Sequence, residues 1–266
     1  MMYIQANGIR IHYELEGSSS APVMTLSNSL ATNLSMWEPQ MEILLRSYRV
    51  LRYDTRGHGK SEVSEGPYSF EMLAADVRSL LRALGIEKTY FMGISMGGMI
   101  GQQLALESPE MLTSMILCDT SSHVPQEAWP IWDERIRIAE TQGLEPLLQQ
   151  TLERWFTLPF RNQHPEVIKK IGDMIRATDR RGYIGCCHAI RNLNLRDRLR
   201  EIRVPTLILV GEEDLGTPVS AAQTIQEGIA GSKLVVLKSA AHLSNIEQSK
   251  RFNDAVASFL GKNAKT

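Results

Sequence analysis

Short apolar runs, separated by polar and glycine-containing segments, are the first feature of this chain. They span Tyr3–Ala6, Ile9–Leu15, Val23–Leu26, Val50–Tyr53, Tyr90–Met92, Met115–Cys118, Thr206–Val210 and Leu234–Leu237. From Val23 onward the runs are brief and do not alternate strictly between apolar and polar residues, which is typical of strands buried on both faces of a parallel sheet. Asn7-Gly8, between the first two runs, favours a two-residue hairpin turn. We therefore expect an antiparallel hairpin followed by parallel strands.

Helical periodicity fills most of the segments between these runs. Apolar residues recur at three- and four-residue steps at Phe70, Leu73, Val77, Leu80, Leu81 and Leu84, and Gly85 then provides a stop signal. A second helix is expected over Gly98–Glu107, ending near Pro109, and a last one contains Phe252, Val256, Phe259 and Leu260. Strands that alternate with helices predict an α/β fold, with a mostly parallel central sheet and helices on both of its faces.

The stretch 124–193 breaks this alternation. Its strand signal vanishes, helical patterns such as Ile168, Ile171 and Ile175 take over, and it holds most of the tryptophans of the chain. We interpret it as a helical cap inserted into an α/β core made of residues 1–123 and 194–266. The predicted place of the cap is over the carboxyl edge of the sheet, where open α/β sheets bind ligands.

Composition and charge narrow the class of protein. The 266 residues are 43% apolar and 22% charged, with a net charge of −1, which suits one large domain with an insertion. The near-zero charge and the lack of basic clusters argue against nucleic acid or an anionic membrane as a partner. No apolar run approaches the roughly 18 residues of a membrane span. Residues 1–6 lack the basic start and apolar middle of a signal peptide, so we expect a cytoplasmic protein.

The cysteines give no sign of a disulfide framework or a metal site. Cys118, Cys186 and Cys187 are odd in number and two are adjacent, which favours the reducing cytoplasm. Only Cys187 lies beside a histidine, His188, and zinc sites normally show three or four well-spaced ligands. We expect no metal and no cofactor. The oligomeric state stays open, and a homo-oligomer is compatible with the sequence.

Gly93-Ile94-Ser95-Met96-Gly97 is the strongest candidate for chemistry. It follows an apolar run directly and opens a predicted helix, and glycines at two residues before and after a serine suit a tight strand-to-helix turn that exposes the hydroxyl. The alternative is an ordinary glycine-rich turn with a solvated serine, because this pattern also occurs by chance. As a nucleophile, Ser95 needs a base within hydrogen-bond reach and an acid that orients the base.

His242 and Asp214 are the expected partners of Ser95. Each follows a late apolar run, so in a parallel sheet all three residues meet at one edge, in the chain order Ser, Asp, His. Glu212 and Glu213 compete with Asp214 for the role of the acid. The remaining histidines lie in the N-terminal hairpin, in the turn after Tyr53, or at or within the cap, namely His12, His58, His123, His164 and His188. For those positions a fixed role in a triad is not expected.

Two backbone N–H groups are the expected donors to an oxyanion. Met96 N–H lies beside the nucleophile at a helix start, and Leu30 N–H belongs to the loop after Val23–Leu26. The Ser29 hydroxyl in the same loop adds a candidate substrate contact, with a hydrogen bond inside the loop as the alternative.

These residues resemble the α/β-hydrolase fold enzymes. The segment Arg52–Ser61 looks like the turn after the fourth strand of that superfamily, and His242 followed by Glu247 matches its final loop. Within the superfamily the chain is similar to the 3-oxoadipate enol-lactone hydrolases of aromatic catabolism. The matching segments are Leu26–Leu30, Asn33–Trp37, Arg52–Ser61, Arg154–Phe156 and Ser244–Glu247.

The resemblance implies catalytic roles for Ser95, Asp214 and His242, and a cap that contacts the carboxylate of a small carboxylated lactone or ester. Arg135 is the candidate for that contact, because guanidinium binds carboxylate in a forked, two-bond manner; as an alternative, Arg135 and Arg137 are solvated helix charges. Trp129 and Trp155 are candidates for the pocket wall, or anchors of the cap. Competing interpretations are a carboxylesterase, a carbon–carbon bond hydrolase and a non-catalytic binding protein of the same fold.

Overall fold

The computed structural model describes residues 2–263. Met1, the first residue of the segment 1–6 in which no signal peptide is expected, lies outside the described residues. An eight-stranded sheet forms its centre, in the order β1-β2-β4-β3-β5-β6-β7-β8. The strands are β1 (Met2–Ala6), β2 (Ile9–Glu16), β3 (Val23–Ser27), β4 (Arg49–Tyr53), β5 (Thr89–Ile94), β6 (Leu112–Cys118), β7 (Thr206–Gly211) and β8 (Lys233–Leu237). β2 pairs antiparallel with β1 and β4, and the remaining pairs are parallel.

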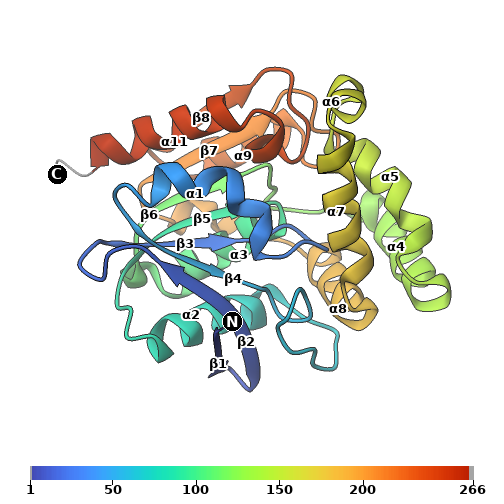
Figure 1. Ribbon diagram of the computed structural model, residues 1–266, viewed down its shortest axis with the longest axis horizontal. Coiled ribbons are helices and arrows are strands. Elements are labelled where there is room, and N and C mark those ends of the chain that lie inside the picture. Colours follow the sequence, from blue (N-terminus) through green and yellow to red (C-terminus); the bar gives the residue numbers. More distant parts are fainter. Residues whose placement is uncertain (1, 264–266) are drawn as a thin grey trace.

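Helices cover both faces of this sheet (Figure 1). α2 (Phe70–Ala83) and α3 (Met96–Glu107) pack against each other, and α3 also contacts β3, β5 and β6. α1 (Glu38–Leu44) and α11 (Ser249–Asn263) form a second contacting pair, with α10 (Ser244–Glu247) beside them, and α9 (Val219–Gly228) packs on β7 and β8. The predicted α/β fold class, with a mostly parallel sheet, is confirmed.

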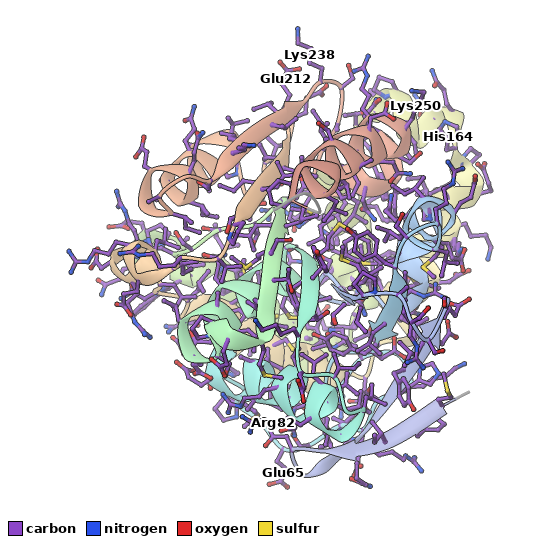
Figure 2. All side chains as sticks on the ribbon, turned by 90° about the vertical axis from the view of Figure 1, so that its left-hand side faces the viewer. Glu65, Arg82, His164, Glu212, Lys238 and Lys250 are labelled. Carbon is purple, nitrogen blue, oxygen red and sulfur yellow. The ribbon has the colours of Figure 1, made fainter. Side chains whose placement is uncertain are left out.

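Local sequence explains where these helices begin and end. Ser69 caps α2, because its hydroxyl accepts a hydrogen bond from Met72 N–H at 3.3 Å. Gly85 has φ +68, which stops α2 in a left-handed conformation that glycine adopts without strain. Charged side chains such as Arg82, Glu212 and Lys250 project from the periphery in Figure 2, around the buried apolar core.

The insertion between β6 and β7 is helical. It consists of α4 (Trp129–Gln142), α5 (Glu145–Trp155), α6 (Leu158–Gln163), α7 (Pro165–Ala177) and α8 (Arg180–Arg191). These helices gather at one end of the sheet, on the right of Figure 1. An isolated antiparallel bridge pairs His123 with Asn194, so the chain leaves the core and returns to it at one point. Within residues 2–263, no helix is both long and apolar enough to cross a membrane.

Candidate active site

Ser95 occupies the sharp turn between β5 and α3. Its φ of 54 and ψ of −118 are a strained combination for a residue with a side chain. The flanking glycines make the turn sterically possible: a Cβ on Gly93 would collide with the Gly97 carbonyl, and a Cβ on Gly97 would collide with the Ser27 carbonyl on β3. The Thr120 hydroxyl donates to Ser95 O at 2.7 Å and helps to hold the turn.

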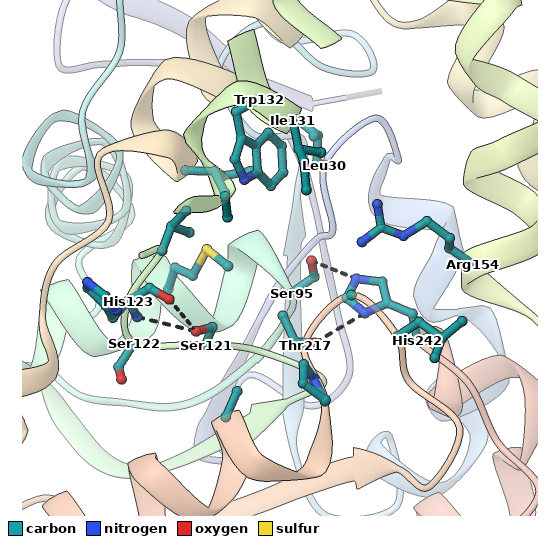
Figure 3. A pocket seen from close by; sticks show the side chains of 18 of the residues that line it. Leu30, Ser95, Ser121, Ser122, His123, Ile131, Trp132, Arg154, Thr217 and His242 are labelled. Atoms are coloured by element: carbon teal, nitrogen blue, oxygen red, sulfur yellow. Dashed lines mark hydrogen bonds between the residues drawn. The ribbon is translucent and has the colours of Figure 1, made fainter. Parts of the chain in front are cut away.

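The structure brings His242 and Asp214 to Ser95. His242 Nε2 lies 2.8 Å from Ser95 Oγ (Figure 3), and His242 Nδ1 lies 2.8 Å from Asp214 Oδ2. All three residues are nearly buried, with exposed fractions of 7%, 5% and 3% for Ser95, His242 and Asp214. With a proton on Nδ1, the imidazole donates to Asp214, and Nε2 is left to accept the proton of the serine hydroxyl. The arrangement can therefore generate a serine nucleophile.

Asp214 is held in its charged form by donors that converge on it. Gly216 N–H and Thr217 N–H donate to Oδ1 at 2.7 and 3.0 Å, and the Thr217 hydroxyl donates to Oδ2 at 2.7 Å. Burial alone would raise the pKa of Asp214, but the adjacent His242 and these hydrogen bonds outweigh it and lower the pKa below its usual value. Glu212 and Glu213, the competing acids, are exposed.

A second buried carboxylate, Asp119, was not anticipated from the sequence. It directly follows β6, has φ 44, and is fully buried. Gly211 N–H donates to its Oδ1 at 2.8 Å and the Ser244 hydroxyl to its Oδ2. Burial, and next the nearby charge of Asp214, raise the pKa of Asp119 well above its usual value. Its position at a strand end, like that of Asp214 after β7, was the signal that could have revealed it.

The expected oxyanion donors have no hydrogen-bond partner among residues 2–263. Leu30 N–H and Met96 N–H make no hydrogen bond to any group in the described part of the chain. Leu30 lines the cavity in front of Ser95, and Met96 is the first residue of α3, where the helix N-terminus favours negative charge. The Ser29 hydroxyl is also buried without a partner and lines the same cavity.

A cavity of about 560 Å³ opens in front of Ser95, between core loops and the helical insertion. Arg135, Trp155 and Ser29, which the sequence nominated for substrate contact, all line it. Trp129 is not among the residues that line it, and the Arg191 guanidinium lies 4.3 Å from its ring centroid, which fits the alternative prediction that Trp129 anchors the cap. Trp132, one helical turn later on α4, lines the cavity instead.

The charged groups that line this cavity are cationic. Arg135, Arg154 and Arg196 line it, and no Asp or Glu within residues 2–263 does so. Arg135 is engaged, since it donates to the Tyr183 hydroxyl at 3.1 Å and to the Thr151 hydroxyl at 3.0 Å. The arrangement suits an anionic ligand. Elsewhere in the described chain, no group of three His, Cys, Asp or Glu side chains is placed to hold a metal ion.

The histidine loop is joined to the insertion. The Trp155 ring stacks on His242 with centroids 6.1 Å apart, and Leu243 N–H donates to Trp155 O at 3.1 Å. Glu247 accepts from Thr157 N–H at 3.0 Å and from Ala241 N–H at 2.8 Å. The end of α5 and the residues after it thus support the loop that carries the candidate base.

Comparison with known proteins places this site in a family. A family model for the alpha/beta hydrolase fold matches residues 22–249. The 3-oxoadipate enol-lactonase 2 of Acinetobacter baylyi is 37% identical over 97% of this chain and 95% of its own length. The crystal structure of the enol-lactonase from Burkholderia xenovorans LB400 is 39% identical, with a TM-score of 0.94 over 98% of this chain and 100% of that one. A malate-bound thermophilic esterase from Thermogutta terrifontis is 28% identical, with a TM-score of 0.92 over 99% of each chain. The chain is therefore a hydrolase and belongs to the alpha/beta hydrolase fold family.

Proposed function

We propose that this enzyme opens 3-oxoadipate enol-lactone to 3-oxoadipate by acyl transfer through Ser95, in the breakdown of aromatic compounds. The observation that carries the proposal is the hydrogen-bonded series Ser95–His242–Asp214, which opens into a cavity with arginine as its charged lining. The enol-lactonases of Acinetobacter baylyi and Burkholderia xenovorans, similar over nearly the whole chain, support the choice of a lactone.

In the first step Ser95 Oγ attacks the lactone carbonyl while His242 Nε2 takes the hydroxyl proton. Asp214 fixes the imidazole tautomer and stabilises the imidazolium that forms. Negative charge develops on the carbonyl oxygen, where Leu30 N–H and Met96 N–H are the donors. One such donor contributes on the order of a hundredfold in rate, because the N–H group already points at the carbonyl oxygen before the negative charge develops there.

In the second step the ring carbon–oxygen bond breaks and the proton on His242 passes to the enol oxygen. The negative charge that develops on the enol oxygen is delocalised over the adjacent double bond, which makes the leaving group good. The later tautomerisation of the enol to a ketone makes the opening irreversible in practice. A water molecule, deprotonated by His242, attacks the acyl-serine ester, and Ser95 regains its proton as the second carboxylate is released. One water is consumed and 3-oxoadipate is the product.

A carboxylesterase is the second candidate, since the esterase from Thermogutta terrifontis is also similar over the whole chain. The two functions differ in the substrate and share the proposed nucleophile. The arginine lining favours a substrate that carries a carboxylate, because buried guanidinium groups gain most from a charged, forked partner. A non-catalytic binding protein of the same fold is the remaining alternative.

The deciding experiment compares wild type with Ser95→Ala. We expect wild type to release a burst of 4-nitrophenol from 4-nitrophenyl acetate and to turn over the enol-lactone, and the variant to lose on the order of 10⁶-fold in kcat for both. Ser220→Ala, at the rim of the same cavity, is the matched control and should keep wild-type turnover. Full turnover by Ser95→Ala would reject the nucleophile. A wild type without turnover of either compound would identify a binding protein.

A further inference from the structure

Arg154 stands out among the cations of the cavity. It lies near the end of α5, half-buried, with its guanidinium turned toward the space in front of Ser95 and His242 (Figure 3). Within residues 2–263 it forms no ion pair and donates no hydrogen bond to a side chain or backbone oxygen. A half-buried guanidinium without a protein partner depends on the solvent of the cavity for its hydrogen bonds, and a ligand carboxylate can take the place of that solvent. This group is the candidate for a ligand contact.

The other two arginines of the cavity are in different situations. Arg135 has its own hydroxyl partners, Tyr183 and Thr151, and its guanidinium also lies 5.7 Å from the Trp132 ring centroid. Arg196 is exposed, so water satisfies it. Burial, and next the charge of Arg135, lower the pKa of Arg154, although Asp214 opposes the shift. An anion placed at Arg154 would relieve this repulsion between two guanidinium groups.

Arg154 lies beside the base of the proposed reaction. A Cβ added to Gly216 would lie 3.6 Å from Arg154 Nη2 and 3.5 Å from His242 Nδ1, so the guanidinium and the imidazole flank the same glycine. The next residue, Trp155, stacks on His242. Arg154 is therefore on the His242 side of Ser95. His123 and Ser121 lie on the opposite side in Figure 3.

The side on which Arg154 lies has a chemical meaning. His242 Nε2 must reach the leaving oxygen to protonate it, so substituents carried by that oxygen's carbon lie on the His242 side of the scissile carbonyl. The carbonyl oxygen points to Leu30 N–H and Met96 N–H, and the acyl chain takes the remaining direction. A cation next to His242 is thus in reach of the leaving-group part of a substrate.

We propose that Arg154 binds the substrate carboxylate and selects esters and lactones that carry it on the leaving-oxygen side. The proposal rests on the hydrolase function proposed above and adds a rule for its substrates. It fits the enol-lactone, whose carboxymethyl group is attached to the ring carbon that bears the leaving oxygen. The guanidinium supplies two parallel N–H donors, which match the two oxygens of a carboxylate.

Two isomeric anions test the rule. Acetoxyacetate carries its carboxylate on the leaving side, and monomethyl malonate carries it on the acyl side, with the same atoms and charge. We expect wild type to prefer acetoxyacetate in kcat/KM, measured by acid release. Arg154→Gln should lower the preference for acetoxyacetate over 4-nitrophenyl acetate by about 10- to 100-fold, the value of a lost charge-assisted pair. Arg154→Lys keeps the charge and loses the forked pair of donors, so its preference for acetoxyacetate should lie between those of wild type and Arg154→Gln.

Arg137→Gln is the matched control, because Arg137 is an exposed arginine of α4, paired with Glu134 and absent from the cavity. It should leave the preference within about threefold. Wild type without a preference for acetoxyacetate over monomethyl malonate overturns the proposal, as does an Arg154→Gln variant that loses activity on every ester in parallel. Wild type that prefers acetoxyacetate but leaves the enol-lactone unopened rejects the proposed function and retains the role of Arg154.

Discussion

At the scale of single residues, two buried carboxylates at neighbouring strand ends have pKa values shifted in opposite directions. Asp214 faces an imidazole as well as its hydrogen-bond donors, whereas Asp119 has donors from Gly211 and Ser244 but no cation, and has Asp214 as a neighbour. Burial acts on both, so the difference comes from their partners. The pair shows that depth alone does not decide whether a carboxyl group is charged.

This contrast makes a prediction about stability and pH. The folded-state pKa of Asp119 is raised above its unfolded value, so its contribution to stability is fully present below the unfolded value and is lost as pH rises through the folded one. An asparagine side chain has nearly the same shape, and its amide oxygen can accept a hydrogen bond from Gly211 N–H or the Ser244 hydroxyl without carrying a charge. We expect Asp119→Asn to gain free energy of unfolding relative to wild type as pH rises from 4 to 8, measured by urea denaturation.

Asp197→Asn, a change at an exposed carboxylate, serves as the control and should show no such trend. A constant difference between wild type and Asp119→Asn at every pH would mean that Asp119 stays charged in the folded protein.

At the scale of elements, the turn between β5 and α3 couples the candidate nucleophile, Ser95, to the loop after β3 that carries the proposed oxyanion donor Leu30. Gly97 touches the Ser27 carbonyl at the end of β3, and the residues that follow Ser27 lead to Leu30. Any side chain on Gly97 pushes on backbone, which cannot move aside as a flexible side chain can. The close contact therefore places Leu30 N–H and Met96 N–H relative to each other.

Gly97→Ala is expected to damage both stability and catalysis. The added Cβ forces β3 and α3 apart, and we expect about 1–3 kcal/mol of destabilisation together with a lower kcat for the enol-lactone. Urea denaturation and initial rates measure the two effects. Gly261→Ala, in α11 with open space around its Cβ, is the control and should be neutral or slightly stabilising. A Gly97→Ala variant with wild-type kcat would show that the turn between β5 and α3 tolerates the shift.

The strands of the sheet could be predicted from the sequence, because a strand that is buried on both faces consists almost entirely of apolar residues. Every predicted strand is present, and Ser95, Asp214 and His242 meet because strand ends in a parallel sheet share an edge. The sequence of the insertion shows no comparable pattern that tells which of its side chains face the cavity. Trp129 and Trp132 are one turn apart on α4, yet Trp132 lines the cavity, whereas the guanidinium of Arg191, distant in sequence, lies over the Trp129 ring. The unpaired state of Arg154 depends likewise on which side chains the fold brings near it.

At the scale of the whole molecule, the cavity is a junction between the core and the helical insertion. Core loops supply Leu30, Ser95 and His242, and the insertion supplies Arg154 and Trp132. A ligand that contacts both parts binds only the folded, assembled protein, so it adds to the stability of the whole chain by mass action.

Adipate is a stable dicarboxylate with the chain length of the proposed product, and it tests this linkage. At about 100 times its Kd, we expect adipate to raise the Tm of wild type by about 5 °C, measured by calorimetry. Arg154→Gln should show a much smaller rise at the same concentration. An equal rise in both proteins would place the dicarboxylate elsewhere.

The hydrogen bonds from Leu243 N–H to Trp155 O, and from the Thr157 N–H and hydroxyl to Glu247, have a consequence for recombination between relatives. They join the insertion to the loop that carries the candidate base, His242, so the insertion cannot be exchanged without affecting that loop. A chimera that exchanges only residues 124–193 replaces one side of these contacts and leaves the other unmatched. We therefore expect a chimera to gain the substrate specificity of its donor, with His242 correctly oriented, only when residues 241–247 are exchanged together with the insertion.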